Sequence, residues 1–316
     1  MNTPDLQRLA IDSRSRREAG VTLLLASFIL GLFLVVPRMF ETTPSPSPIV
    51  IATSTVQSAF STVSIEARAA VVYDLATGEI LYSKNADAQL PLASLTKLLT
   101  VYAALSELSP TTPITVPRSA AAVEYPRALP VGSVFALDDL ARVTLTGSLN
   151  DGAVAIAEAT ADRESRSQRE MLAGAAAALE LSQTYALNGS GLDVSKMLSG
   201  AYGSAKDLAR LAGALVEKAP AIARATTARA AEAISLSGLA VAVKNTDPFI
   251  DGIPHLLLSK TGFTDLAGGN LALVFDAAIR HPVAIVVLGS TVKERFTDAT
   301  ALVAATFAHF AGVPSL

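Results

Sequence analysis

The spacing of apolar residues divides the chain into strand-forming ends and a helix-forming middle. Two runs rich in β-branched and apolar residues, 70–74 and 79–83, flank the short glycine-containing segment Ala76-Thr77-Gly78, which is typical of a β-hairpin. After Pro91, apolar residues recur at intervals of three and four, and this spacing predicts a helix that starts at Ser94. The apolar positions of that helix are Leu95, Leu98, Leu99, Tyr102 and Leu105.

The middle of the chain, to about Ala233, is rich in alanine and leucine at helical spacing. The predicted helices there cover residues 137–145, 153–161, 169–181 and 205–218. Strand-forming sequence returns at residues 256–259, 270–275 and 283–288, and a closing helix is predicted at 294–310. Strands at both ends with helices between them indicate an α+β fold, an antiparallel sheet flanked by helices with an inserted helical subdomain.

An uncharged apolar run at residues 19–36 has about the length that a helix needs to cross a bilayer. Four arginines precede the run, whereas only Arg38 follows it before Arg68, so residues 1–18 should stay in the cytoplasm. The alternative is a cleaved signal peptide. The apolar region of a signal peptide is usually only about 7–15 residues long, which is shorter than this run. After the run, the chain has several prolines where a small-x-small cleavage site would lie. We therefore expect a single-pass protein of the cell membrane, anchored by this helix.

Residues 37–64 are rich in proline, serine and threonine, a composition that favours extended backbone. We interpret them as a linker that holds a folded domain, residues 65–316, outside the membrane.

Composition narrows the possible chemistry. A net charge of −3 and a pI near 5.7 argue against a nucleic-acid partner. The absence of cysteine excludes disulfides, thiolate metal sites and cysteine nucleophiles. The three histidines, His255, His281 and His309, lack metal-ligand spacing, and the chain has no G-x-S-x-G elbow. We expect no metal or other cofactor, and a serine enzyme of this sequence would use a base other than histidine.

Three short motifs follow one another: Ser94-Leu95-Thr96-Lys97, Ser148-Leu149-Asn150 and Lys260-Thr261-Gly262. The first two are weak singly, because the chain also contains Ser290-Thr291-Val292-Lys293 and Ser83-Lys84-Asn85. We interpret Ser290 as the end of a strand before a surface loop, and Ser83 as the end of a strand before a polar turn. Both are therefore set aside.

The setting of the first motif suits a nucleophile and its base. A serine at a helix start and a lysine three residues later lie on one face, one turn apart. A serine hydroxyl is a poor nucleophile until a base removes its proton. Lys97 can be that base if burial or a neighbouring cation lowers its pKa, and Lys260 would supply such a cation.

At these motifs the chain resembles the low-molecular-mass D-alanyl-D-alanine carboxypeptidases, the serine peptidase family of penicillin-binding proteins. The similar stretches are residues 70–105, 131–158, 188–211 and 260–276 (the last reads KTGFTDLAGGNLALVFD), within a match over roughly 65–310. The resemblance implies the penicillin-binding/β-lactamase-like transpeptidase fold. It also implies hydrolysis of peptidoglycan stem peptides that end in D-Ala-D-Ala, with β-lactams as covalent inhibitors.

The resemblance implies catalytic roles for the first two motifs. Ser94 would attack the carbonyl and carry the acyl group, with Lys97 as its base. Ser148 would pass a proton to the departing D-alanine amine and bridge Lys97 to Lys260. Asn150 would bind a substrate amide and help to hold Lys97.

It implies binding roles for the third motif. Lys260 and Thr261 would bind the terminal carboxylate of the substrate, and Gly262 would let the strand approach the substrate backbone closely. The oxyanion would lie between the backbone N–H groups of Ser94 and Phe263.

One position departs from the family pattern, and for two acidic residues near the motifs we expect structural roles. Leu149 stands where the family usually has glycine or a small residue, which affects the expected shape of the cleft. We expect Asp151 to be a helix N-cap and Asp265 a turn residue.

A β-lactamase would need a deacylating glutamate, usually in an E-x-x-L-N loop, but Thr184 stands at that position before Leu187-Asn188. A D,D-endopeptidase would use the same residues as a carboxypeptidase. A non-catalytic β-lactam sensor or wall-binding scaffold is the remaining alternative.

Overall fold

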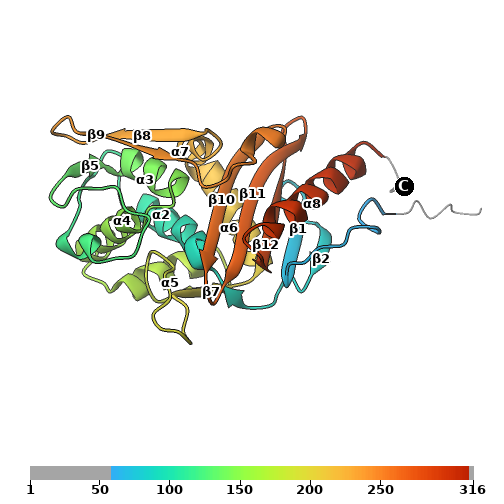
Figure 1. Ribbon diagram of the computed structural model, residues 1–316, viewed down its shortest axis with the longest axis horizontal. Coiled ribbons are helices and arrows are strands. Elements are labelled where there is room, and N and C mark those ends of the chain that lie inside the picture. The colour runs from blue at the N-terminus through green and yellow to red at the C-terminus, as the bar shows by residue number, and fades with distance from the viewer. Residues whose placement is uncertain (1–57, 313–316) are drawn as a thin grey trace, which may run out of the picture. The chain divides into compact units, whose positions relative to one another are not determined.

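The computed structural model describes residues 58–312. In this part of the chain, five strands form an antiparallel sheet in the order β10-β11-β12-β1-β2 (Figure 1). They are β1 (Ala69–Asp74), β2 (Ile80–Lys84), β10 (Leu256–Thr264), β11 (Gly268–Ala278) and β12 (His281–Ser290). Strands from both ends of the domain therefore build one sheet, and β10, which carries the third motif, is an edge strand.

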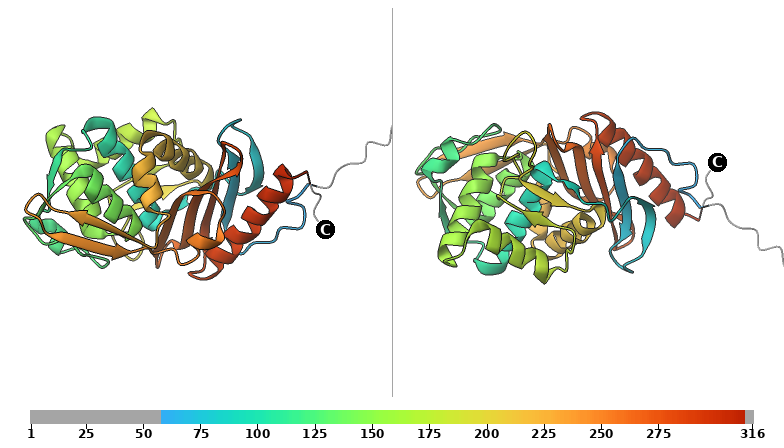
Figure 2. Two further views of the ribbon diagram at one scale, coloured as in Figure 1. Left: turned by 90° about the horizontal axis from the view of Figure 1, so that it is seen from above. Right: turned by 90° about the horizontal axis from the view of Figure 1, so that it is seen from below.

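Helices lie on both faces of this sheet (Figure 2). Helix α8 (Glu294–Phe310) covers one face, and α6 (Ala205–Lys218) packs on the other face against the helical region. The other helices are α2 (Thr96–Glu107), α3 (Leu137–Thr146), α4 (Asn150–Arg163), α5 (Gln168–Ala178) and α7 (Pro220–Ala225). The 3₁₀ turns are η2 (Ala93–Leu95), η3 (Arg118–Ala121) and η4 (Ile250–Gly252).

Smaller sheets brace the helical region. One has the order β3-β7-β6, built from β3 (Leu90–Pro91), β7 (Ala201–Gly203) and β6 (Tyr185–Ala186). The two-stranded sheets are β4 (Pro113–Thr115) with β5 (Val134–Ala136), and β8 (Ala230–Ile234) with β9 (Ala240–Lys244). Strand β3 matters for function, because it runs directly into the turn that carries Ser94.

The main sheet separates two apolar cores. In β1, Ala69 and Val71 face the core shared with the helical region, while Ala70 and Val72 face the core beneath α8. Because both faces are buried at the centre of the sheet, residues 69–72, 271–275 and 283–288 are continuous apolar runs that do not alternate with polar residues.

The α+β architecture predicted from the sequence, an antiparallel sheet flanked by helices, is confirmed. Helices α6 and α8 have the predicted bounds, and the β1–β2 hairpin turns where expected, with Gly78 at a φ of 78°. Helix α2 begins at Thr96 and not at Ser94, which lies in the preceding 3₁₀ turn. The prediction of helix up to about Ala233 is wrong at its end, because residues 230–234 form strand β8.

The predicted membrane helix, residues 19–36, lies outside the described residues, as do residues 1–18 and most of the linker. No helix within residues 58–312 is long and apolar enough to cross a membrane. Two residues assigned to the linker, Ala59 and Phe60, are buried on the domain, and the Phe60 ring lies 5.9 Å from that of Tyr82. The folded unit thus begins before residue 65.

Candidate active site

Ser94 lies in a strained turn between β3 and α2. The preceding residue, Ala93, has a φ of 48°, a left-handed conformation that costs a non-glycine residue about 1–3 kcal/mol. The Thr96 hydroxyl donates to the Ala93 carbonyl at 2.7 Å and holds the turn closed. Ser94 is partly exposed, whereas Lys97, one helical turn later, is completely buried.

Lys97 is arranged to be neutral. Burial lowers its pKa to about 7, against a smaller opposing effect of the Asp151 carboxylate. Its Nζ lies 2.7 Å from Ser94 Oγ, 2.7 Å from Asn150 Oδ1 and 2.8 Å from the Ser190 carbonyl oxygen. A neutral amine has two N–H bonds and one lone pair. Because the Asn150 Oδ1 and the Ser190 carbonyl oxygen can only accept, they take the two N–H bonds of the neutral amine, and its lone pair is left to face the Ser94 hydroxyl.

The Ser190 carbonyl is a site group that the sequence did not reveal. Asn188 holds its loop, since Asn188 Oδ1 accepts from the backbone N–H groups of Ser190 (3.2 Å) and Gly191 (2.8 Å). A side chain at Gly191 would overlap the Ala93 carbonyl oxygen, with a Cβ only 1.9 Å away. The Asn-Gly-Ser-Gly sequence signals a tight turn, but a backbone carbonyl ligand has no sequence signature.

The second and third motifs meet at Ser148. This residue has a φ of 55° in the turn between α3 and α4, and its Oγ accepts from Lys260 Nζ at 2.8 Å. Lys260 also donates to the Thr261 carbonyl at 2.7 Å. Burial, then repulsion from Lys97 and Arg295, holds the pKa of Lys260 well below its usual value. Within residues 58–312, Ser148 makes no hydrogen bond to Lys97, so the predicted bridge between the two lysines is joined only at its Lys260 end.

The side chains of Asn150 and Asp151 make hydrogen bonds to the backbone of residues 124–129. Asn150 Oδ1 accepts from Lys97, while Nδ2 donates to the carbonyls of Glu124 (3.0 Å) and Tyr125 (3.1 Å). Both amide hydrogens are thus engaged by the 124–125 backbone, and a substrate amide would find no free donor on this side chain. The prediction of an N-cap at Asp151 is wrong, because the cap is Leu149, and the Asp151 carboxylate instead accepts from the backbone at residues 128 and 129.

Gly262 lies against the nucleophile's turn. A Cβ there would be 3.0 Å from the Leu92 carbonyl oxygen and 3.2 Å from the Ser94 nitrogen. The lack of a side chain at Gly262 therefore gives close contact between β10 and this turn, in addition to any approach of a substrate. Beside it, the Thr261 and Thr246 hydroxyls lie 2.6 Å apart.

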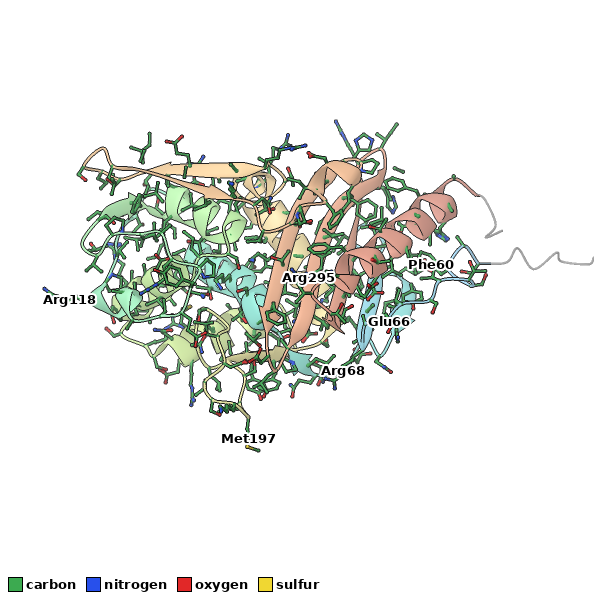
Figure 3. The ribbon with its side chains drawn as sticks, in the orientation of Figure 1. Phe60, Glu66, Arg68, Arg118, Met197 and Arg295 are labelled. Carbon is green, nitrogen blue, oxygen red and sulfur yellow. The ribbon has the colours of Figure 1, made fainter. Side chains whose placement is uncertain are left out.

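Arg295 is a second site residue that the sequence analysis missed. It is buried at the start of α8, where its Nη1 donates to the Gly262 carbonyl at 2.7 Å (Figure 3). Its charge lies behind the strand that carries Lys260 and Thr261. The available signal was an arginine next to Phe296 in the first turn of the closing helix.

A pocket of about 740 Å³ opens in front of Ser94. Asn150 and Phe263 line it, and the side chain of Phe263 is 50% exposed. One wall is the loop at residues 192–196, whose Asp193 accepts from the Thr264 hydroxyl at 3.1 Å. Lys97, Ser148, Lys260 and Thr261 are buried and do not line the pocket.

The residues set aside at the sequence level lie outside this site. Ser290 is buried at the end of β12, where its hydroxyl donates to Asp298 at 2.7 Å. Lys84 donates to the Ile65 carbonyl at 2.7 Å. Leu149 is buried in the core and does not line the pocket, so its side chain does not shape the cleft. Asp265 lies in a turn, as predicted.

Within residues 58–312 there is no cluster of three or more His, Cys, Asp or Glu side chains that could hold a metal ion, and none of the three histidines lines the pocket. Thr184 donates to Asp207 at 2.9 Å, and it does not line the pocket either. The position where a β-lactamase would have its deacylating glutamate is thus occupied by a threonine engaged elsewhere.

This fold, with a buried lysine against a serine in an open pocket, defines an active-site serine peptidase of the penicillin-binding type. The chain belongs to the D-alanyl-D-alanine carboxypeptidase family, peptidase S11, which matches residues 53–292. The resemblance inferred from the three motifs is therefore confirmed.

Individual proteins similar to this chain are consistent with the family assignment. The chain is 30% identical over 239 residues to the D-alanyl-D-alanine endopeptidase of Pseudomonas aeruginosa, covering 74% of each protein. It is 30% identical over 251 residues to the D-alanyl-D-alanine carboxypeptidase DacD of Escherichia coli, and spans 62% of that protein. Among solved structures, the cefotaxime-bound penicillin-binding protein D2 of Listeria monocytogenes has a TM-score of 0.64 at 28% identity, covering 78% of this chain and 98% of that one.

Proposed function

We propose that the protein hydrolyses the terminal D-Ala-D-Ala bond of peptidoglycan stem peptides through an acyl-enzyme on Ser94. The observation that carries this proposal is the contact of 2.7 Å between Ser94 Oγ and a buried lysine whose pKa is lowered to about 7. A neutral amine at this distance can take the hydroxyl proton as the oxygen attacks.

Acylation moves one proton and exchanges one bond. Lys97 takes the proton of the Ser94 hydroxyl while Oγ attacks the carbonyl carbon. The oxyanion that forms lies between the backbone N–H groups of Ser94 and Phe263. As the C–N bond breaks, the departing D-alanine amine takes the proton of the Ser148 hydroxyl, which accepts from Lys260, and Ser148 takes in exchange the proton that Lys97 had received, so Lys97 is neutral again. In deacylation, a water molecule gives a proton to Lys97 as it attacks the ester, and Lys97 passes that proton to Ser94 Oγ as the ester bond breaks.

Positive charge on one side of the cleft suits a substrate with a free C-terminus. Lys260 donates to the Thr261 carbonyl and Arg295 donates to the Gly262 carbonyl. A terminal carboxylate arriving beside Thr261 would gain charge-assisted hydrogen bonds, which are stronger than neutral ones. An internal peptide bond has no such charge.

Endopeptidase action on cross-links is the second candidate, favoured by the similarity to the Pseudomonas aeruginosa endopeptidase. The same serine and lysine would perform it, so the two activities differ in what binds beyond the scissile bond. The missing deacylating glutamate argues against a β-lactamase. The complete set of motif residues argues against a non-catalytic sensor or scaffold.

The test is labelling with a fluorescent penicillin, followed by product analysis on defined muropeptides. Ser94→Ala should abolish both the label and D-alanine release, while Ser290→Ala, in the other S-x-x-K sequence, should leave both intact. An adduct on any serine other than Ser94 would refute the assignment. Cleavage of cross-linked dimers without D-alanine release from monomers would identify an endopeptidase. Rapid loss of the label would identify a β-lactamase, and a stable label without turnover a sensor.

We also propose that residues 19–36 anchor the protein in the cell membrane, with the enzyme domain outside. The length of the apolar run and the arginines before it support this placement. Membrane fractionation together with N-terminal sequencing of the mature protein tests it. A mature N-terminus beyond residue 40 would show a cleaved signal peptide.

A further inference from the structure

We propose that Asn270 is a positioning residue for Ser94, an inference that rests on the function proposed above. Asn270 lies in β11, is completely buried and does not line the pocket. Any effect on the reaction must therefore pass through the groups that it contacts.

Those groups belong to the turn that presents the nucleophile. Asn270 Nδ2 donates to the carbonyl oxygens of Pro91 at 3.0 Å and Leu92 at 3.1 Å, three and two residues before Ser94. Its Oδ1 accepts from the Gly289 backbone N–H at 2.8 Å. The carboxamide is thus fully engaged, with two carbonyls that fix its amide end and one N–H that fixes its oxygen.

The position of Asn270 in the sheet explains this reach. Asn270 pairs with Gly262 across the β10–β11 ladder, and a Cβ on Gly262 would approach the same Leu92 carbonyl oxygen to 3.0 Å. Because Gly262 has no side chain, the turn can touch the sheet, and Asn270 supplies the hydrogen bonds that hold it there. Ala93, at a φ of 48°, needs such outside contacts, since a strained residue persists only where its surroundings determine it.

The hydrogen bonds of Asn270 affect the geometry of the proposed oxyanion site. One proposed donor, the Ser94 N–H, belongs to the turn, and the other, the Phe263 N–H, belongs to β10. Asn270 fixes the turn against the sheet and so fixes the spacing of the two donors. A misplacement of about 1 Å in such a site costs roughly 100-fold in rate. Neither the Pro91 nor the Leu92 carbonyl is needed to bind substrate in the pocket. Substitution of Asn270 should therefore lower kcat and leave KM nearly unchanged.

The experiment compares Asn270→Ala and Asn270→Asp with the wild-type full-length protein. Asn270→Ala should lower penicillin acylation and kcat on a D-Ala-D-Ala peptide by roughly 30- to 100-fold, with KM within about threefold. Asn270→Asp keeps the shape and the acceptor for Gly289 but sets a carboxylate against two carbonyls, so its loss should be larger. The aspartate is isosteric and gives the measurement if the alanine variant does not fold.

Asp207→Ala is the matched control. Asp207 is buried away from the pocket, and its carboxylate holds the backbone N–H of Gln183 at 2.8 Å and the Thr184 hydroxyl at 2.9 Å. Its loss should lower the unfolding temperature but leave the acylation rate below that temperature near wild type. Folded Asn270 variants with wild-type kcat, or with a change in KM alone, would overturn the positioning role. A wild-type protein that takes no penicillin label would instead overturn the proposed function, and this inference with it.

Discussion

The substitution Lys97→Arg distinguishes two possible roles of Lys97, as a positive charge and as a general base that accepts a proton. The substitution keeps a cation, but a guanidinium stays protonated and cannot serve as a base near neutral pH. The wild-type amine has a pKa of about 7 because it is completely buried, so about half of it is neutral at pH 7.

The expected loss is large. A positioned general base contributes roughly 10²- to 10⁴-fold, which corresponds to about 2.7–5.4 kcal/mol at 1.36 kcal/mol for each tenfold change. The arginine would also keep a permanent charge near Lys260, whose pKa is already lowered by burial and by repulsion from Lys97. We therefore expect acylation of Lys97→Arg by penicillin to be about 10⁴-fold slower than that of the wild type.

The same pKa predicts the pH dependence of the wild type. A base must be deprotonated to act, so acylation should rise with pH and level off above the pKa of about 7. At pH 6 only about a tenth of the lysine is neutral, and each further unit downward should cost about tenfold.

The assay is the second-order rate of labelling by a fluorescent penicillin from pH 5 to 9. Lys84→Arg is the matched control, because Lys84 donates to the Ile65 carbonyl outside the pocket. Lys97→Arg within tenfold of the wild type, or a wild-type rate independent of pH down to 5, would refute Lys97 as the base.

Three further substitutions test the surroundings of this pair. Thr261→Val should lower kcat/KM for carboxylate-ended peptides roughly 10- to 100-fold more than for their amidated analogues, whereas equal losses would remove its carboxylate-binding role. Gly262→Ala would set a methyl group 3.0 Å from a carbonyl oxygen of the nucleophile's turn, so acylation should fall about tenfold or more. Asn188→Ala should make the position of the Ser190 carbonyl less fixed. Acylation should then be slower, and the pH at which the acylation rate rises should shift. An unchanged pH profile would show that this carbonyl does not orient Lys97.

The fold could largely be predicted because its elements follow local rules. Residues 205–218 and 294–310 carry an apolar stripe at helical spacing, and both helices form where that stripe begins and ends. The β8–β9 hairpin was missed because alanine dominates β8 and favours a helix, while pairing with β9 decides the outcome. Its remaining sequence signal was the Ser237-Gly238 turn.

From the residues alone, the candidate site was predictable only where its groups are side chains close in sequence, whereas the contacts of Lys97 with Asn150 and of Ser148 with Lys260 were expected from the family resemblance. Ser94 and Lys97 are one turn apart, so their contact follows from helix geometry. The amide donors of Asn150 are taken by the 124–125 backbone, and Arg295 reaches β10 from a helix that begins some thirty residues later in the chain. Such contacts depend on how distant segments pack, which the local pattern does not contain.

In this geometry, the residues of the three motifs depend on contacts from outside the motifs. A neutral Lys97 presents its lone pair to Ser94 only if two acceptors occupy its N–H bonds. The second motif supplies one acceptor, Asn150, and the other is the Ser190 carbonyl, which belongs to no motif. Likewise, the glycine of the third motif permits contact with the nucleophile's turn, but Asn270 makes the hydrogen bonds. A chain could thus keep every motif residue and lose the reaction through a change at residues 188–191 or 270.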